Sequence, residues 1–157
     1  MDVTQIPGLE ENVLPLFSEV GRDMSKWPTA GHFVSWLPLC PDNDISGGKL
    51  LWRRVRTVKN RAGHFFRLAA FSLHHSPTPL GNYLRRMKAK LGPEAATTTT
   101  AYKIAVIFYT MVKNQVEYDE SIWATRDAHR DKRLEMKLKR QAKLLGYQLV
   151  PMEQNAA

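Results

Sequence analysis

The sequence predicts a mainly α-helical fold, and three observations support that class. Apolar residues recur at helical spacing in several segments, as they do at Ala101, Ile104, Ala105 and Phe108. Residues that typically start or end helices flank those segments. A long basic stretch near the C-terminus carries leucines on one stripe. We therefore expect two N-terminal helices, a basic arm that forms a short ribbon or extended segment, a central buried helix and a long basic C-terminal helix.

The two N-terminal helices are expected on either side of Gly21. An Ile6-Pro7-Gly8 turn leads into a short amphipathic helix that Gly21 ends. Thr29 is the expected N-cap of the second helix, Ala30 to Leu37. The layout is helix-hairpin-helix-like, but the position of that motif's second glycine holds Glu10. Because a carboxylate repels phosphate, we expect a structural helix pair here.

The most informative stretch runs from residue 37 to residue 63. Pro38 and Pro41 prevent a helix from continuing through its start. Ser46 is followed by Gly47 and Gly48, which permit positive φ and a close approach by a large ligand. A serine hydroxyl on an exposed turn beside cations suits attack on a phosphodiester. Ser46 is therefore the candidate nucleophile, although Ser-Gly-Gly is also a common loop sequence.

The basic arm that follows Ser46 supplies the candidate phosphate ligands. They are Lys49, Arg53, Arg54, Arg56, Lys59 and Arg61. From Ile45 to Pro93 the chain has eleven Lys or Arg and no Asp or Glu, and the net charge is +8. This distribution favours a nucleic-acid partner. The alternative is a solvated basic surface with no partner.

Three further helices are expected before residue 118. The stretch His64 to His75 is apolar around most of its circumference and is the predicted central buried helix, after Asn60, Ala62 and Gly63 close the arm. Pro79 to Leu91 reads as a basic helix that Gly92-Pro93 stops. A threonine within Thr97 to Thr100 is the expected N-cap of the helix Ala101 to Lys113.

The composition changes after residue 118, so we expect two parts, residues 1–118 and residues 119–157. Residues 121–145 hold eight Lys or Arg against three acids, with Leu134, Leu138 and Leu145 on one stripe. We interpret this segment as a long, largely exposed helix that Gly146 ends, followed by a short extended tail. It could bind nucleic acid, pair with another subunit, or remain a solvated helix.

The sequence gives no sign of export or membrane insertion. Residues 1–5 lack the basic start and apolar run of a signal peptide, and no segment reaches about 18 apolar residues. The single Cys40 excludes an internal disulfide and fits a reducing compartment. We expect a cytoplasmic protein without a membrane partner.

With these residues in place, the chain resembles the C-terminal transposase domain of the serine-dependent, bridge-RNA-guided insertion-sequence transposases of the IS116/IS110/IS902 family. The similarity covers nearly the whole chain in the expected order. It is carried by Ile6–Gly8, Phe33–Pro41, Ser46–Lys49, the basic arm, Asn60–Ala62, Leu68–Ala70, Pro79–Gly81, Tyr83–Arg86, Tyr102-Lys103, Tyr118, Lys139–Lys143 and Gly146–Pro151.

The resemblance implies a chemistry for the serine. In that family the serine of this motif attacks a DNA phosphodiester and forms a covalent phosphoserine link, which assigns that role to Ser46. The family also carries an N-terminal RuvC-like domain whose four acidic residues hold divalent metal (Mg). This sequence has no such spaced acidic tetrad, so we assign no metal ligands in it. The resemblance further implies a structured guide RNA, a homo-oligomer and a prokaryotic, nucleoid-associated site of action.

Three function classes are compatible with the sequence. The chain is part of a transposase that needs the metal-binding domain, or it is a non-enzymatic helical nucleic-acid-binding module or inactive transposase remnant. The third class is a protein-interaction module that uses the final basic helix. A binding module has no need of Ser46, whereas an enzyme part should gain activity when the metal-binding half is supplied in trans.

Overall fold

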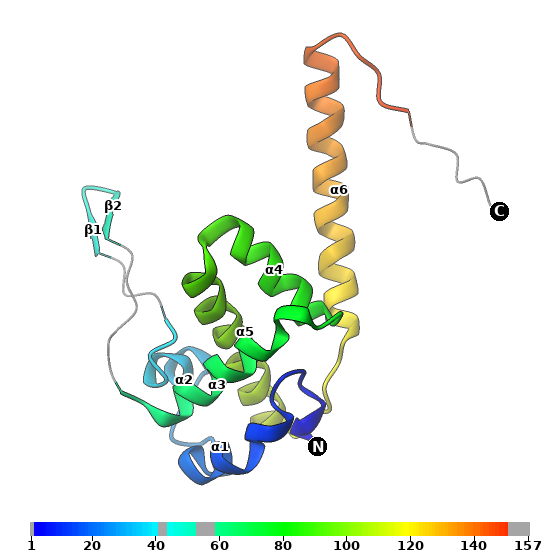
Figure 1. Cartoon of the computed structure of the whole chain (residues 1–157). Helices are drawn as coiled ribbons and strands as arrows, with labels where there is room; N and C mark the ends of the chain where they lie inside the picture. Colours follow the sequence, from blue (N-terminus) through cyan, green and yellow to red (C-terminus); the bar gives the residue numbers. More distant parts are fainter. Residues whose placement is uncertain (1, 41–43, 53–58, 151–157) are drawn as a thin grey trace, which may run out of the picture. The chain divides into compact units, whose positions relative to one another are not determined.

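The computed structural model describes residues 2–40, 44–52 and 59–150 and confirms the mainly α fold class (Figure 1). It divides into two compact units, Met1–Tyr118 and Asp119–Ala157. The elements in chain order are the 3₁₀ helices η1 (Val3–Gln5) and η2 (Glu10–Asn12), α1 (Val13–Val20), α2 (Ala30–Trp36), β1 (Asp44–Ser46), β2 (Lys49–Trp52), α3 (Arg61–Ser72), the 3₁₀ helix η3 (Leu73–His75), α4 (Pro79–Leu91), α5 (Pro93–Asn114) and α6 (Ser121–Leu144).

Helix α5 organises the first unit, because α2, α3 and α4 all pack against it (Figure 1). Three rings mark the centre of this packing: Phe33 of α2, Phe66 of α3 and Phe108 of α5 are all fully buried. Phe66 and Phe108 meet edge to face with ring centroids 5.6 Å apart. Phe33 lies 6.1 Å from Phe66 and 6.2 Å from Phe108. Aromatic burial of this extent dominates the stability of a small core.

The N-terminal helices form where their capping residues predict. The Thr29 hydroxyl accepts a hydrogen bond from the backbone N–H of His32, which confirms Thr29 as the N-cap of α2. Gly21 follows the last residue of α1, and its N–H donates to the carbonyl of Phe17. The loop between these helices is tied to α5 by the Tyr109 hydroxyl, which donates to the carbonyl of Trp27 at 2.7 Å.

Helix α3 differs from its prediction at its start and in its burial. It begins at Arg61, so Ala62 and Gly63 lie in its first turn and do not close the arm. Leu68 and Phe71 are 42% and 65% exposed. The expected burial around most of the circumference is therefore wrong, because α1 and α5 cover only one side of α3. Helix α5 contributes more buried residues than α3 does.

Helix α5 begins eight residues before its predicted start. Gly92 stands at its N-cap and Pro93 is its first residue, a position where the missing N–H of proline costs nothing. The expected threonine cap is therefore wrong. The hydroxyls of Thr97, Thr99 and Thr100 instead donate to the carbonyls four residues earlier, which satisfies them inside the helix.

The second unit contains α6, the predicted long basic helix. The described side chains after Trp123 are largely exposed, and Leu134 and Leu138 are 53% and 42% exposed. Gly146 occupies the C′ position, where its N–H donates to Lys143, and the N–H of Tyr147 donates to Ala142. No described helix is long and apolar enough to span a bilayer.

Candidate nucleophile and nucleic-acid interface

A two-stranded hairpin presents the candidate nucleophile. Strands β1 and β2 are antiparallel, and Ser46 pairs with Lys49 at their ends. Only Gly47 and Gly48 connect the two strands, with φ of 56° and 75°. A two-residue turn of the type I′ class needs positive φ at both central residues, which glycine adopts without strain. The hairpin tip, residues 46–49, therefore owes its geometry to this pair of glycines.

Ser46 and Lys49 lie on the same face of the hairpin. Residues directly opposite each other in an antiparallel pair have Cβ atoms about 4.5–5.5 Å apart and point to the same side. Both residues are exposed. A phosphate that contacts the Ser46 hydroxyl on this face is therefore close to the Lys49 side chain. Sequence spacing alone does not show that the two side chains share a face.

The middle of the basic arm falls outside the described residues. It contains Arg53, Arg54 and Arg56, for which phosphate binding stays a prediction. Strand β2 covers the first part of the arm, Lys49–Trp52, as part of a ribbon. The description resumes at Lys59, which leads into α3.

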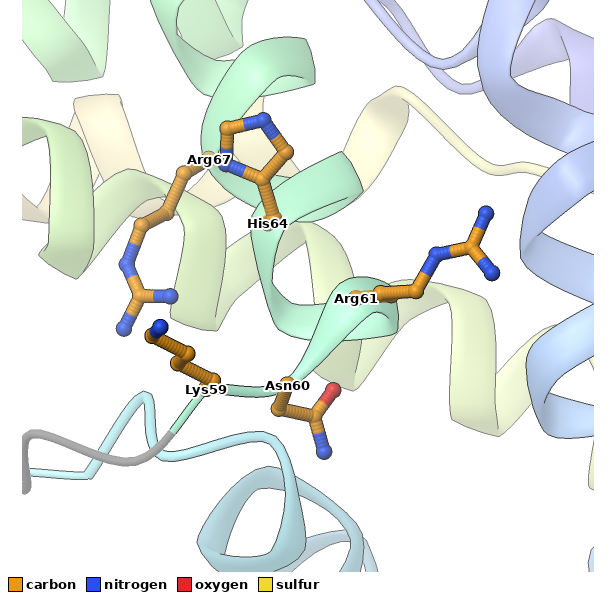
Figure 2. A pocket seen from close by; sticks show the side chains of 5 residues that line it. All are labelled: Lys59, Asn60, Arg61, His64 and Arg67. Atoms are coloured by element: carbon orange, nitrogen blue, oxygen red, sulfur yellow. The ribbon is translucent and has the colours of Figure 1, made fainter.

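Five residues at the start of α3 line an open depression of about 350 Å³ (Figure 2). We call this group the arm base: Lys59, Asn60, Arg61, His64 and Arg67. It holds two of the predicted phosphate ligands, Lys59 and Arg61. Figure 2 shows the side chains of Lys59 and Arg67 reaching toward the same region, whereas Arg61 points away from them.

Asn60 fixes the position of the arm base on the helical body. Its Oδ1 accepts the N–H of Gly63 at 2.8 Å and so caps α3. Its Nδ2 donates to the carbonyl of Trp36 at 3.0 Å, at the end of α2. The Asn60 side chain therefore caps α3 and also links α3 to the end of α2.

Arg67 is a member of the arm base that the sequence did not single out. Its Nη2 donates to the carbonyl of Pro38 at 2.8 Å, which links α3 to the segment that follows α2. Partial burial lowers the pKa of its guanidinium, but arginine remains charged at physiological pH because its ordinary pKa lies far above neutrality. Arg67 belongs to the acid-free window, which is the one sequence signal that could have marked it. Because Arg67 falls within the predicted central buried helix, the sequence did not indicate it as a phosphate ligand.

Arg61 has an acidic partner within the protein. Its Nη1 lies 3.0 Å from Oε1 of Glu19 on α1, and the two side chains are 78% and 31% exposed. An ion pair this exposed is worth at most about 1 kcal/mol. A DNA or RNA phosphate can therefore compete with Glu19 for Arg61.

The Ile6-Pro7-Gly8 turn packs inward. Gly8 has φ of 86°, and a Cβ built on it would overlap the backbone carbonyl oxygen of Ala69 on α3. Among the described residues, η1 is the element before this turn, and η2 and α1 follow it. Gly8 therefore serves helix packing, and the helix-hairpin-helix likeness stays a prediction.

The potential metal ligands in the described part of the chain are scattered. Among the described residues, no group of three or more His, Cys, Asp or Glu lies close enough together to hold an ion. These residues do not fit the divalent metal that the family resemblance implies, so we assign its ligands to none of them.

Comparison with known protein families gives a match. The family model described as transposase IS116/IS110/IS902 family matches residues 2–82. That range contains the hairpin, the arm base and all of α3, and it ends within α4. No curated protein and no solved structure matches the chain.

Proposed function

The chain belongs to the transposase IS116/IS110/IS902 family, and from this premise we propose that Ser46 is the nucleophile of DNA transposition. The family assigns the chain to transposition and recombination of DNA in general terms. The observation that carries the finer proposal is the pairing of Ser46 with Lys49 across the Gly47-Gly48 turn. On one exposed face, the hydroxyl can supply the nucleophile and the cation can stabilise the negative charge that develops on the phosphate.

The reaction is a transesterification at phosphorus. The Ser46 Oγ forms a bond to the phosphorus of the DNA backbone and gives up its proton. The bond from phosphorus to one deoxyribose oxygen breaks, and that oxygen takes up a proton as the strand end departs. In this proposal Lys49 binds the non-bridging phosphate oxygens, where negative charge increases in the transition state. The product is a phosphoserine ester that conserves the energy of the broken bond for rejoining.

The arm base supports this reaction by binding the nucleic-acid backbone. Lys59 and Arg67 face the same depression, and the exposed pair of Arg61 with Glu19 is weak enough to yield to a phosphate. Such contacts are independent of sequence and fix the position of a strand. We assign them to DNA or to a structured guide RNA, with Arg53, Arg54 and Arg56 as further ligands, in a homo-oligomeric enzyme.

The metal-binding part of the reaction belongs to the RuvC-like domain that the family carries. The described residues of this chain form no metal site. From the resemblance to that family, we propose that the chain reacts together with that domain and its divalent metal.

The test is trapping of the covalent adduct. The full chain is combined with a RuvC-like domain of the family, the RNA transcribed from the same DNA element, and labelled duplex DNA spanning the element ends. A denaturing gel detects DNA bound to protein. We expect an adduct with the wild type and none with Ser46→Ala, while Ser18→Ala, which removes another exposed serine, behaves as wild type.

The outcomes separate the candidate functions. An adduct that persists in Ser46→Ala places the nucleophile elsewhere. If the wild type binds DNA but yields no adduct in the reconstituted mixture, the chain is a non-enzymatic nucleic-acid-binding module or an inactive remnant.

A further inference from the structure

Helix α3 has two sharply different sides. At 100° per residue, Ala62, Phe66, Ala69 and Ala70 fall on one side, and all four are buried. The opposite arc holds Arg61, His64, Arg67, Leu68 and Phe71. None of these five is fully buried, and three of them belong to the arm base. We call this arc the outer face of α3.

An aromatic ring stands in the middle of this basic surface. Phe71 is 65% exposed, one helical turn beyond Arg67, and Leu68 beside it is 42% exposed. The Phe71 ring has a neighbour in the His74 imidazole, with centroids 5.7 Å apart and planes tilted by 40°. Much of the ring therefore stays open to a ligand with a flat π-system.

Fixed cations continue the surface beyond the end of α3. The Arg85 Nη1 donates to the carbonyls of His74 and Ser76 at 3.2 and 2.8 Å, which holds its guanidinium at η3. The Lys88 ammonium lies 2.8 Å from Nε2 of His74. These two cations of α4 therefore lie just beyond the C-terminal end of α3. Arg67 lies one turn before Phe71, so the aromatic ring stands between basic groups.

The charge of this region suits a polyanion. The chain from Ile45 to Pro93 has no Asp or Glu, and Glu19 of α1 meets the face through its weak, exposed pair with Arg61. From Arg61 to His75 the helical rise gives a length of roughly 20 Å, which about six nucleotides cover at a rise of 3.4 Å. A polyanion with flat rings along its length matches both the charges and the exposed aromatic side chain.

We propose that the outer face of α3 binds unpaired DNA, with Phe71 stacked on a base. Arg67 binds the backbone on one side of that base, and Lys88 binds it on the other. A paired base shows its π-face only to its neighbours in the stack, so an exposed ring on a helix surface selects an unpaired base. The proposal rests on DNA as the partner of the family and is independent of Ser46 chemistry.

The test is equilibrium binding of the full chain to labelled single-stranded DNA, measured by fluorescence anisotropy. Phe71→Ala is expected to raise Kd about 5- to 100-fold, and Phe71→Trp to restore it, because stacking is lost and regained. The matched control is Leu14→Ala, which removes an 81% exposed apolar side chain from α1 and should leave Kd unchanged. A single 2-aminopurine in the strand reports stacking directly, since its fluorescence is quenched on binding only when Phe71 or Trp is present.

Three results would overturn the proposal. Equal affinities for Phe71→Ala and Leu14→Ala show that the ring makes no contact. If Phe71→Ala weakens binding of duplex DNA as much as binding of single-stranded DNA, the surface does not select unpaired bases. A loss confined to single-stranded RNA shows that the face serves RNA. Because the assay involves no bond breakage, its failure leaves the adduct test of Ser46 unaffected, and the reverse also holds.

Discussion

The hairpin tip and the arm base hold their functional groups by different means. At the tip, a turn of two glycines with positive φ places Ser46 and Lys49 directly opposite each other on the two strands. At the base, Asn60 and Arg67 are bonded to backbone carbonyls of Trp36 and Pro38, and α3 packs against α5. Local backbone geometry sets the first arrangement, and the packed core sets the second. Mutations should therefore affect the tip and the base separately.

The largest effect should come from the core that supports the arm base. Phe33→Ala removes the ring that contacts both Phe66 and Phe108, and all three are fully buried. Loss of a buried Phe typically lowers the free energy of unfolding by about 3–5 kcal/mol. Urea unfolding followed by circular dichroism measures it.

The control for this prediction lies at the tip. Ser46→Ala changes an exposed residue of the hairpin, so its unfolding free energy should stay within about 0.5 kcal/mol of wild type. If Ser46→Ala destabilised the chain as much as Phe33→Ala, the tip would be part of the packed core. The tip and the arm base would then not respond to mutation separately.

A smaller effect should follow from strain confined to the tip. Gly48 has φ of 75°, and nothing lies within 4 Å of a Cβ built on it. The Cβ of a valine therefore meets no neighbour, and Gly48→Val is expected to cost mainly the backbone strain of a β-branched residue at positive φ, roughly 1–2 kcal/mol. A two-stranded hairpin is marginally stable. We expect about 5- to 30-fold less Ser46 adduct, with the midpoint of global unfolding unchanged.

Gly31→Ala is the matched control for that substitution. Gly31 is helical, and a Cβ there meets only the Thr29 hydroxyl at an ordinary 3.5 Å. Replacing a helical glycine by alanine commonly stabilises by up to about 1 kcal/mol. Adduct yield should be that of wild type. Full adduct formation by Gly48→Val would show that the turn does not position Ser46.

Local signals predicted local structure well in this chain. Thr29 caps α2 as expected, and α4 has the predicted bounds because Pro79 starts it and Gly92 ends it. The same reasoning fails at α5, because Gly92-Pro93 predicts a helix stop whereas proline also suits the first position of a helix. A Gly-Pro pair between two helices can therefore mark both the end of the first helix and the start of the second.

Burial on α3 could not be predicted from the sequence, because it depends on which elements cover the helix. Phe66 and Phe71 look alike in an apolar stretch, yet one is fully buried and the other is 65% exposed. The same cause hid Arg67, which the fold brings into the arm base beside the predicted Lys59 and Arg61. For Ser46 a chemical argument and a family resemblance were available from the sequence, and its role as nucleophile stays a prediction.

The smallest effect concerns the one acid among the described residues that contacts the arm base. Glu19 lies 3.0 Å from Arg61 in an exposed pair, so it competes with phosphate for that guanidinium. Glu19→Gln keeps the shape of the side chain and removes its charge. DNA affinity should rise about 2- to 5-fold, which corresponds to at most about 1 kcal/mol. Anisotropy titrations at several salt concentrations should show the gain shrinking as salt rises.

Glu11→Gln shows whether this gain is specific to the arm base. Glu11 is an exposed acid of η2, and its replacement changes the net charge by the same amount as Glu19→Gln. An equal gain from both variants would mean that DNA responds only to total charge. A gain from Glu19→Gln alone, abolished by adding Arg61→Ala, would locate a phosphate at Arg61. The arm base would then bind DNA through Arg61, a cation that pairs with Glu19 when no phosphate is bound.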